Sequence, residues 1–322
     1  MTETRKPSCP RCGEEVKESW KFCPACETPL TPPSCPHCGI PVKAHWRRCP
    51  ECGNPLICKT CGTRLSAGQA ECPACGRREA ADEPLSQTFR EPITGMVFLP
   101  VPAGSFLMGD TFGDGFENEL PVHEVTLDSY YIARYPVTQS QWTTLMGDNP
   151  SKFKGELHPV EQVTWHEARA FVRKLTEAHK GEWVFDLPTE AQWEYAARSG
   201  GRQEFYAGGD DVESLAWYDE NSGGTTRPVG LKAPNGLGIH DMSGNVWEWC
   251  LDGYEADAYK RHASRNPVHL KEDLDRILRG GSWNIDAWSV RCARRFSLRA
   301  DLSGAGVGFR PVMLPVRGER KR

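Results

Sequence analysis

The segment PNGLGIHDMSGNVWEWCLDGY, residues 234–254, alternates turn-forming residues with large apolar side chains. Gly, Pro and Asn punctuate local structure, so a segment that repeats them at short intervals predicts ordered loops rather than long helices or strands. The same composition continues through LRGGSW at 278–283 and GFRPV at 308–312. Residues 94–316 therefore predict a single domain with unusually little regular secondary structure.

Short local signals place helices and strands around these loops. Partly alternating apolar residues predict strands within 98–108 and 123–132. Three capping boxes, in which a Thr is followed three residues later by Gln or Glu, predict helix starts; they are Thr138/Gln141, Thr164/Glu167 and Thr189/Gln192. Apolar residues at helical spacing predict the buried faces of the last two helices: Ala168, Phe171, Val172 and Leu175, then Trp193, Ala196 and Ala197. The fold class is therefore α+β.

The overall composition is that of a soluble globular protein. Apolar residues make up 39% and charged residues 25% of the chain, which excludes disordered and fibrous classes. The mean hydropathy is −0.56, and no apolar run approaches the roughly 20 residues that a membrane span needs. The opening MTETRKPSCP lacks the features of a secretory signal. The net charge of −4 gives no drive towards nucleic acid or membrane. We expect a cytoplasmic protein without a membrane partner.

Cysteine spacing defines a second region at the start of the chain. Each of three units, at 9–26, 35–52 and 58–75, contains two Cys-x-x-Cys pairs separated by ten residues. Such pairs present two sulfurs to one metal, and two pairs complete the tetrahedral site that structural zinc prefers. We predict three zinc ribbons within 1–76, whose ligands are Cys9, Cys12, Cys23, Cys26, Cys35, Cys38, Cys49, Cys52, Cys58, Cys61, Cys72 and Cys75.

Two alternatives to these zinc ribbons stay open. A disulfide scaffold suits secreted chains, for which the start of this sequence gives no sign. Interleaved pairing, with Cys23/Cys26 joined to Cys35/Cys38, would break the equal spacing. Each unit is too short to fold on apolar burial alone, so metal binding would supply its stability.

The ribbons carry only a weak indication of a partner. Residues 1–76 hold ten Lys or Arg against seven Asp or Glu, and this small excess does not indicate a phosphate-binding surface. A module that docks protein, or nucleic acid only weakly, is favoured. Residues 77–93 are polar and without periodicity, which predicts a linker, and 317–322 form a basic tail.

The order of motifs in the larger domain resembles the formylglycine-generating enzyme family, also called sulfatase-modifying factors. The motifs are VPAGSFLMGD (101–110), PVTQSQW (136–142), PVEQVTWHEARAF (159–171), LPTEAQWEYAAR (187–198), the segment 234–254, LRGGSW and GFRPV. The resemblance implies a compact fold related to C-type lectins and poor in regular structure.

The catalytic residues of that family are missing at the matching positions. As the resemblance implies, the enzymes oxidise a substrate cysteine using copper held by two cysteines shortly after the RGGSW motif. This chain has Ile285 and Val290 there, and Cys292 aligns better with a later, non-catalytic cysteine. Ser282 and Trp247 match residues that line the enzymes' pocket, but neither can bind copper in place of a thiolate pair. The sequence therefore argues against copper and against formylglycine generation.

Another catalytic apparatus is not evident, although an enzyme of a different oxidation or transfer reaction remains the alternative function. The seven His residues of the domain show no metal-ligand spacing. Glu190, Glu194 and Glu248 are interpreted as helix-end or buried hydrogen-bonding carboxylates rather than acid–base pairs.

Calcium is the second metal that the resemblance implies. The family holds this ion at the loop that matches GNVWEW, which here would use the Asp241 side chain and the carbonyl oxygens of Gly244 and Val246. The alternative is that Asp241 and Asn245 satisfy loop amides. Leu215 stands where a side-chain ligand of a second family site would be expected.

The segment RGGSWNIDAWSVRCARRFSLRADLSGAGVGFRPV, residues 279–312, is similar to the variable region of diversity-generating retroelement proteins, which display a hypervariable ligand-binding surface on this fold. Those elements randomise adenines, most usefully in AAC codons, which cannot become Lys, Glu, Gln, Met or Trp by changes at their first two positions. None of these five residues occurs in 294–306. The alternative is a family member with a fixed loop.

This segment and its surroundings contain the predicted ligand contacts. Aromatic rings offer contact area at low entropy cost and Arg offers forked donors, although Trp288 and Arg291 could also be core positions. The candidate residues are Trp247, Ser282, Trp283, Asn284, Asp286, Trp288, Arg291, Arg294, Phe296, Arg299 and Asp301. The sequence thus predicts a non-catalytic member of the family that binds an unknown ligand, expected to be a protein, with zinc ribbons for docking.

Overall fold

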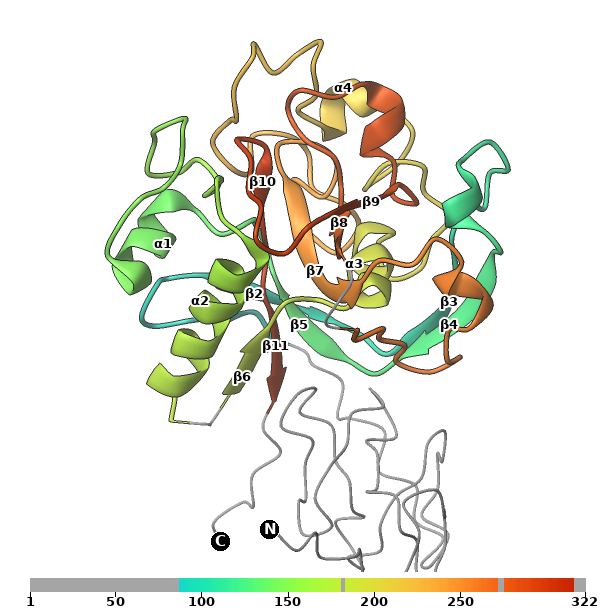
Figure 1. Cartoon of the computed structure of the whole chain (residues 1–322), viewed down its shortest axis with the longest axis horizontal. Coiled ribbons are helices and arrows are strands. Elements are labelled where there is room, and N and C mark those ends of the chain that lie inside the picture. Colours follow the sequence, from blue (N-terminus) through green and yellow to red (C-terminus); the bar gives the residue numbers. More distant parts are fainter. Residues whose placement is uncertain (1–86, 181–182, 272–274, 316–322) are drawn as a thin grey trace, which may run out of the picture. The chain divides into compact units, whose positions relative to one another are not determined.

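The structure is a computed structural model that describes residues 87–180, 183–271 and 275–315 (Figure 1). The predicted zinc ribbons of 1–76 and the basic tail 317–322 lie outside the described residues. The chain consists of two compact units, residues 1–80 and 81–322. The fold described below is that of the second unit alone.

A five-stranded antiparallel sheet forms the base of the domain. Its strand order is β1-β2-β5-β11-β6. The strands are β1 Phe89–Arg90, β2 Val97–Val101, β5 Tyr130–Ala133, β11 Val312–Pro315 and β6 Trp183–Asp186. Because β11 lies between β5 and β6, residues 312–315 join strands from the beginning and the middle of the described chain into one sheet.

Two helices pack beside this sheet. They are α1 Gln139–Met146 and α2 Trp165–Ala178, which lie side by side in Figure 1 with α2 next to β6. The capping boxes at Thr138 and Thr164 form as predicted. The predicted face of α2 is buried and joins one of the two large apolar clusters, where the rings of Trp142 and Phe171 stack 5.6 Å apart.

The remaining strands form a hairpin and a mixed sheet. The hairpin pairs β3 Gly104–Met108 with β4 His123–Leu127, and the mixed sheet has the order β10-β7-β8-β9. Its strands are β7 Trp247–Gly253, β8 Arg276–Arg279, β9 Arg295–Leu298 and β10 Val307–Gly308, of which β10 runs parallel to β7. The strands predicted within 98–108 and 123–132 are therefore each two strands that belong to different sheets.

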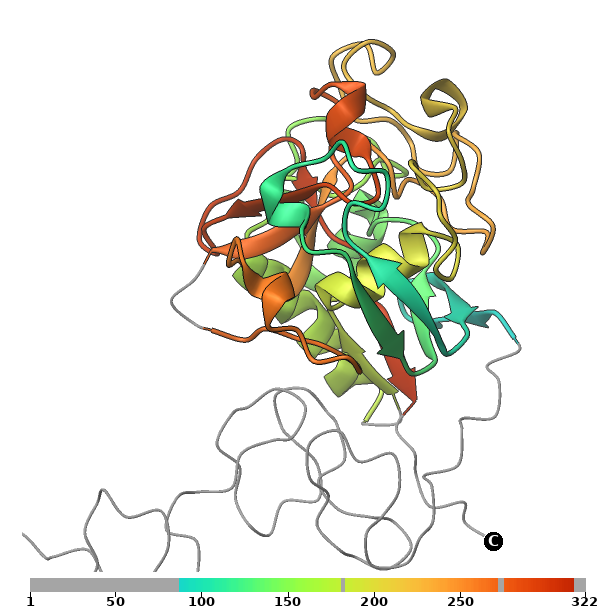
Figure 2. The ribbon, with the colours of Figure 1, turned by 90° about the vertical axis from the view of Figure 1, so that its right-hand side faces the viewer.

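The central helix α3, Glu190–Ala197, joins the hairpin to the mixed sheet. The predicted capping box at Thr189 is present, and nearly every residue of the helix is buried rather than one face alone. Figure 2 shows the green hairpin lying across the yellow helix, and the rings of Phe106 and Tyr195 are 5.2 Å apart. A helix covered on all sides explains why its apolar spacing is incomplete.

Short elements and long ordered loops complete the domain. They are α4 Val212–Leu215 and the 3-10 turns η1 Glu117–Glu119, η2 Ala258–Lys260 and η3 Ala287–Val290. A small apolar cluster joins α4 to η3, with Leu215 packed near Val290. Within the described ranges, no helix combines the length and the apolar content that a membrane span requires. The expected α+β fold with little regular structure is confirmed.

The predicted linker is wrong at its C-terminal end. Phe89 and Arg90 form β1, and the Phe89 ring packs 5.1 Å from Trp183. Glu91 is fully buried, accepts the N–H groups of Ile93 and Thr94 at 2.7 Å, and lies 2.8 Å from His179 Nε2. The polar composition of 77–93 hid this strand because the charged Glu91 acts inside the fold. The domain therefore begins before residue 94.

Candidate functional site

The backbone of the segment after β8 is fixed from both sides. Gly280 and Gly281 adopt positive φ angles of 88° and 77°, which turn the chain sharply. Trp283 then donates its backbone N–H to the Asn245 carbonyl at 3.0 Å and its indole N–H to the Ala305 carbonyl at 2.9 Å. The two ends of the segment 284–306 are thereby tied to each other and to the loop before β7.

A buried network of ion pairs connects β9 and the backbone before it to helix α3. Arg295 donates to both oxygens of Glu190, at 2.7 and 3.0 Å, and Arg279 donates to Glu194 at 2.5 Å. Arg279 also donates to the carbonyls of Cys292 and Ala293, which holds the backbone just before β9. Burial raises the pKa of Glu190, but Arg295 and Arg279 outweigh burial and lower it to about 2. Glu190 therefore stays ionised at neutral pH.

Arg291 belongs to this interior frame and not to the surface. Only 1% of the residue is exposed, and its guanidinium donates to both oxygens of Glu119 at 2.9 and 3.0 Å. Its Nε donates to the Trp288 carbonyl at 2.9 Å. The structure thus places this predicted ligand contact inside the fold, where it holds η3 and η1 together and is not exposed to a ligand.

The structure sorts the other predicted ligand contacts by exposure. Trp247 and Ser282 are buried, whereas Trp283 and Arg294 are half-buried. The exposed members, which all come from 284–301, are Asn284, Asp286, Trp288, Phe296, Arg299 and Asp301. A surface formed by one anchored segment is thus available to a ligand.

Several of the exposed side chains already interact with their neighbours. Asp286 caps η3 by accepting the Ser289 N–H at 2.8 Å, and Arg299 pairs with Asp301 at 2.7 Å. The Phe296 ring stacks on the buried Trp247 at 5.2 Å, so it stands at a defined place on the surface. The face therefore presents side chains in fixed positions rather than on a loose loop.

The two positions that match the copper-binding cysteines lie together and are apolar. Ile285 and Val290 both pack against Gly281: a Cβ added there would lie 2.9 Å from Ile285 Cδ1 and 2.6 Å from Val290 Cγ1. Cys250 and Cys292 are free and fully buried. Burial raises the pKa of Cys292 to about 12 and that of Cys250 well above its usual value. Both thiols therefore stay protonated and unreactive.

The three glutamates interpreted as structural are buried partners of arginines. In addition to Glu190 and Glu194, Glu248 accepts from Arg310 at 2.8 Å through both oxygens and from the Trp193 indole at 2.6 Å. Both oxygens of each of these carboxylates accept hydrogen bonds from buried groups, which leaves no oxygen free to act as an acid or a base. Their arrangement supports the interpretation made from the sequence.

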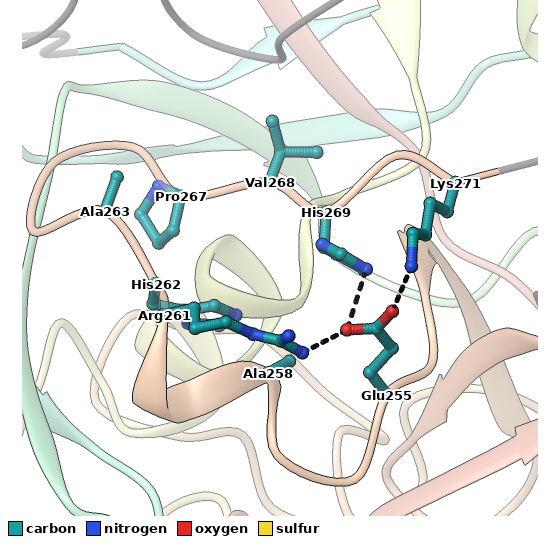
Figure 3. Close-up of a pocket in the computed structure, with 9 residues that line it drawn as sticks. All are labelled: Glu255, Ala258, Arg261, His262, Ala263, Pro267, Val268, His269 and Lys271. Carbon is teal, nitrogen blue, oxygen red and sulfur yellow. Dashed lines mark hydrogen bonds and ion pairs between the residues drawn. The ribbon is translucent and has the colours of Figure 1, made fainter.

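Histidines gather at a pocket that the sequence did not indicate. It has a volume of about 260 Å³ and is lined by Glu255, Arg261, His262 and His269 among others (Figure 3). Figure 3 shows Arg261 and Lys271 directed at the Glu255 carboxylate. The hydrogen bond from Lys271 lowers the pKa of Glu255. Burial lowers the pKa of His262 to about 4. The charge of the Glu255 carboxylate is thus compensated by basic side chains. The described ranges contain no group of three or more His, Cys, Asp or Glu residues suited to a metal.

The loop predicted to bind calcium contains a buried carboxylate, that of Asp241. Among the described residues, no Lys, Arg or His side chain donates a hydrogen bond to it. Asp241 is 3% exposed and accepts the Gly230 N–H at 2.7 Å and the Asn245 amide at 3.4 Å. Burial raises its pKa. A cation would compensate this charge, and the other ligands would be backbone carbonyls such as those of Gly244 and Val246, which calcium accepts. Calcium at this loop stays a prediction, and the loop amides contact Asp241 as in the alternative.

Sequence reasoning missed the loop 110–120, which borders the exposed face. Phe112 and Phe116 are each 42% exposed, and the Phe112 ring lies 5.1 Å from Phe205. Asp110 orders the loop by accepting the N–H groups of Phe112, Gly113 and Gly115. An Asp followed by closely spaced Gly indicates such a turn, but it does not reveal which surface the turn adjoins.

Family models match both parts of the chain. The model described as "Sulfatase-modifying factor enzyme 1-like domain" matches residues 82–314, which is more than half of the chain. The model described as "Double zinc ribbon" matches residues 9–53, which contain the first two of the three cysteine units. Zinc ribbons at the start of the chain are thereby supported, and the third unit, 58–75, stays a prediction.

Curated relatives carry several different names. The chain is 36% identical to the chaperone protein LppX of Paenibacillus barcinonensis over 49% of this chain and 71% of that protein. It is 31% identical to the serine/threonine-protein kinase pkn1 of Chlamydia pneumoniae over 71% of this chain, but it spans only 39% of that protein. It is 29% identical to the formylglycine-generating enzyme of Streptomyces coelicolor over 72% and 93% of the two chains.

Two solved structures share the fold. The Treponema denticola variable protein 1 aligns with a TM-score of 0.61 and 26% identity, covering 72% of this chain and all of that one. PvdO from Pseudomonas aeruginosa aligns with a TM-score of 0.63 and 25% identity, covering 70% and 97%. With the family model, the motif order and the fold in agreement, the chain belongs to the sulfatase-modifying factor family, which includes the formylglycine-generating enzymes.

Proposed function

We propose that the domain binds a ligand, expected to be a protein, through the exposed face of residues 284–301, and that it does not generate formylglycine. One observation carries this proposal. The exposed side chains stand on a backbone that Arg279, Arg291 and Arg295 fix from inside, while the positions of the catalytic cysteines hold Ile285 and Val290. The segment is therefore built to present side chains and lacks the ligands for copper.

The similarity to a variable protein supports a binding role. The Treponema denticola protein shares the fold at 26% identity and is named a variable protein. The segment 279–312 also resembles the variable region of retroelement proteins, and the residues from 294 to 306 are compatible with diversified AAC codons. We infer that exposed positions of this segment can be diversified while the buried frame stays constant.

The zinc ribbons would dock this binding domain to a further partner. Relatives of the domain are named a chaperone, a protein kinase and a formylglycine-generating enzyme. A domain that occurs under such different names is more easily explained by a shared binding function than by one shared reaction. The modest charge of 1–76 favours a protein as the partner of the ribbons over nucleic acid.

An enzyme is the alternative function, because formylglycine-generating enzymes cover 72% of this chain at 29% identity. A turnover assay separates the two functions. The full chain, incubated with copper and a cysteine-containing sulfatase peptide, should form no aldehyde above a protein-free control, because Ile285 and Val290 offer no sulfur to the metal. A formylglycine-generating enzyme in the same buffer is the positive control. Catalytic aldehyde formation by the chain would refute the binding proposal.

A further inference from the structure

An aromatic surface continues from the face of 284–301 onto the loop 110–120. The Phe112 ring contacts Phe205 edge to face at 5.1 Å, and Phe205 contacts Trp288 at 5.9 Å. Phe112 and Phe116 are 42% exposed and Trp288 is 38% exposed. Because Asp110 fixes the loop through three backbone N–H groups, these rings hold their positions before any ligand arrives.

Arg294 is the cation of this surface, and no carboxylate in the described part of the chain forms an ion pair with it. Its guanidinium carbon lies 4.0 Å from the centre of the Phe116 ring, and its Nε is buried without a hydrogen-bond partner among the described residues. Glu119, the nearby carboxylate, has both oxygens occupied by Arg291. Glu119 is therefore engaged by Arg291, and the Nε–H of Arg294 is left without an acceptor among the described residues.

The environment of Arg294 makes this charge costly in the free protein. Arg294 is half-buried, so its cation has lost part of its hydration, and this burial lowers its pKa. A partly dehydrated guanidinium that stacks on an aromatic ring keeps its N–H edge free and oriented. A carboxylate at that edge would gain a charge-assisted hydrogen bond in surroundings of low dielectric constant.

We propose that Arg294 and Phe116 form a subsite for an Asp or Glu side chain of a protein ligand, with Phe112, Phe205 and Trp288 contacting the apolar residues next to it. This inference rests on the proposed binding function and names the chemistry of its ligand. Phe116 lies outside the segment 279–312 that resembles a variable region, whereas Arg294 lies inside it. The subsite would therefore combine one residue that can be diversified, Arg294, with one aromatic ring that cannot, Phe116.

A small carboxylate tests the subsite without knowledge of the natural ligand. In the full chain labelled with ¹⁵N-arginine, the Nε–H signal of Arg294 can be assigned by its loss in R294Q. N-acetyl-glutamate methylamide should shift this signal in a saturable way, and the uncharged N-acetyl-glutamine methylamide should not. Equal shifts with both compounds, or no shift with either, would overturn the inference.

Selection from a phage-displayed random peptide library separates this inference from the proposed function. Peptides selected on the full chain should share an Asp or Glu, bind R294Q at least tenfold more weakly and bind F116A more weakly. R265Q is the matched control: Arg265 is exposed, pairs with Asp128 and lies outside the proposed face. If the selected peptides lack an acidic residue and still bind R294Q, the proposed subsite is contradicted but the proposed binding function is not. A face that selects no peptide would contradict the binding function itself, while the titration still decides on the subsite.

Discussion

Replacing Glu190 with glutamine should destabilise the domain by about 3–5 kcal/mol, because removal of one partner leaves a buried guanidinium without its carboxylate. Glu190 is 1% exposed and accepts from Arg295 through both oxygens. The measurement is the free energy of unfolding in urea at neutral pH. D257N is the control, because Asp257 forms an exposed pair with Arg261, and it should leave the midpoint of unfolding unchanged.

The same substitution should change how stability depends on pH. The pKa of Glu190 is lowered to about 2 from 4.5, so its contribution is complete above pH 4.5 and is lost as the pH falls towards 2. Burial and the charge of Glu190 raise the pKa of Asp252 to about 7. The contribution of Asp252 is therefore present below pH 3.8 and is lost as the pH rises through 7.

E190Q removes the acid-side loss due to Glu190 and also the negative charge that faces Asp252. The pKa of Asp252, followed by carbon NMR of its carboxyl group, should therefore fall in E190Q, and the decline in stability between pH 4 and 7 should become smaller. A variant that unfolds at the wild-type urea concentration, with an unchanged pKa for Asp252, would show that the network does not hold the domain together.

Removal of zinc should unfold the start of the chain and leave the domain intact. Twelve cysteines in three units predict three zinc ions per chain, and binding contributes roughly 10–16 kcal/mol to the folding of zinc-finger peptides. The described part of the domain has its own apolar clusters and contains buried ion pairs such as Arg279–Glu194 and Arg310–Glu248. Its stability should therefore not depend on zinc.

Hydrogen exchange read by mass spectrometry resolves the two regions in one experiment. After chelation of zinc by a strong chelator in calcium-containing buffer, peptides from 9–75 should lose their protection, whereas peptides from β7 and α3 should keep theirs. Readdition of zinc should restore the first group. Protection lost together in both regions would mean that the boundary between them is wrong.

The sequence revealed local structure well because local contacts determine it. The capping boxes at Thr138, Thr164 and Thr189 and the apolar face of α2 involve residues at most a few positions apart. The structural interpretation of Glu190, Glu194 and Glu248 also agrees with the fold. Their partners could not be read in the same way, because Arg295 lies 105 residues from Glu190 and Arg310 lies 62 residues from Glu248.

Long-range pairing also explains what the sequence did not reveal about the site. Arg291 was expected among the ligand contacts, but Glu119, 172 residues away, holds it in the interior. Phe116 approaches Arg294 only because the turn around Asp110 brings the loop to the face. A buried arginine and an exposed arginine cannot be told apart from the sequence of an aromatic-rich segment. Only the fold distinguishes Arg291 from Arg294.

The most direct test of the account is deep sequencing of codons 284–306 across a population, with a search for a near-copy of this stretch beside the gene. The account predicts changes at adenine positions of the template that alter exposed or half-buried residues such as Asn284, Arg294, Phe296, Arg299 and Asp301. The codons of the buried Arg291, Cys292 and Arg295 should stay constant. An invariant segment without a template, or changes spread equally over the buried frame, would contradict the proposal of a diversified binding face.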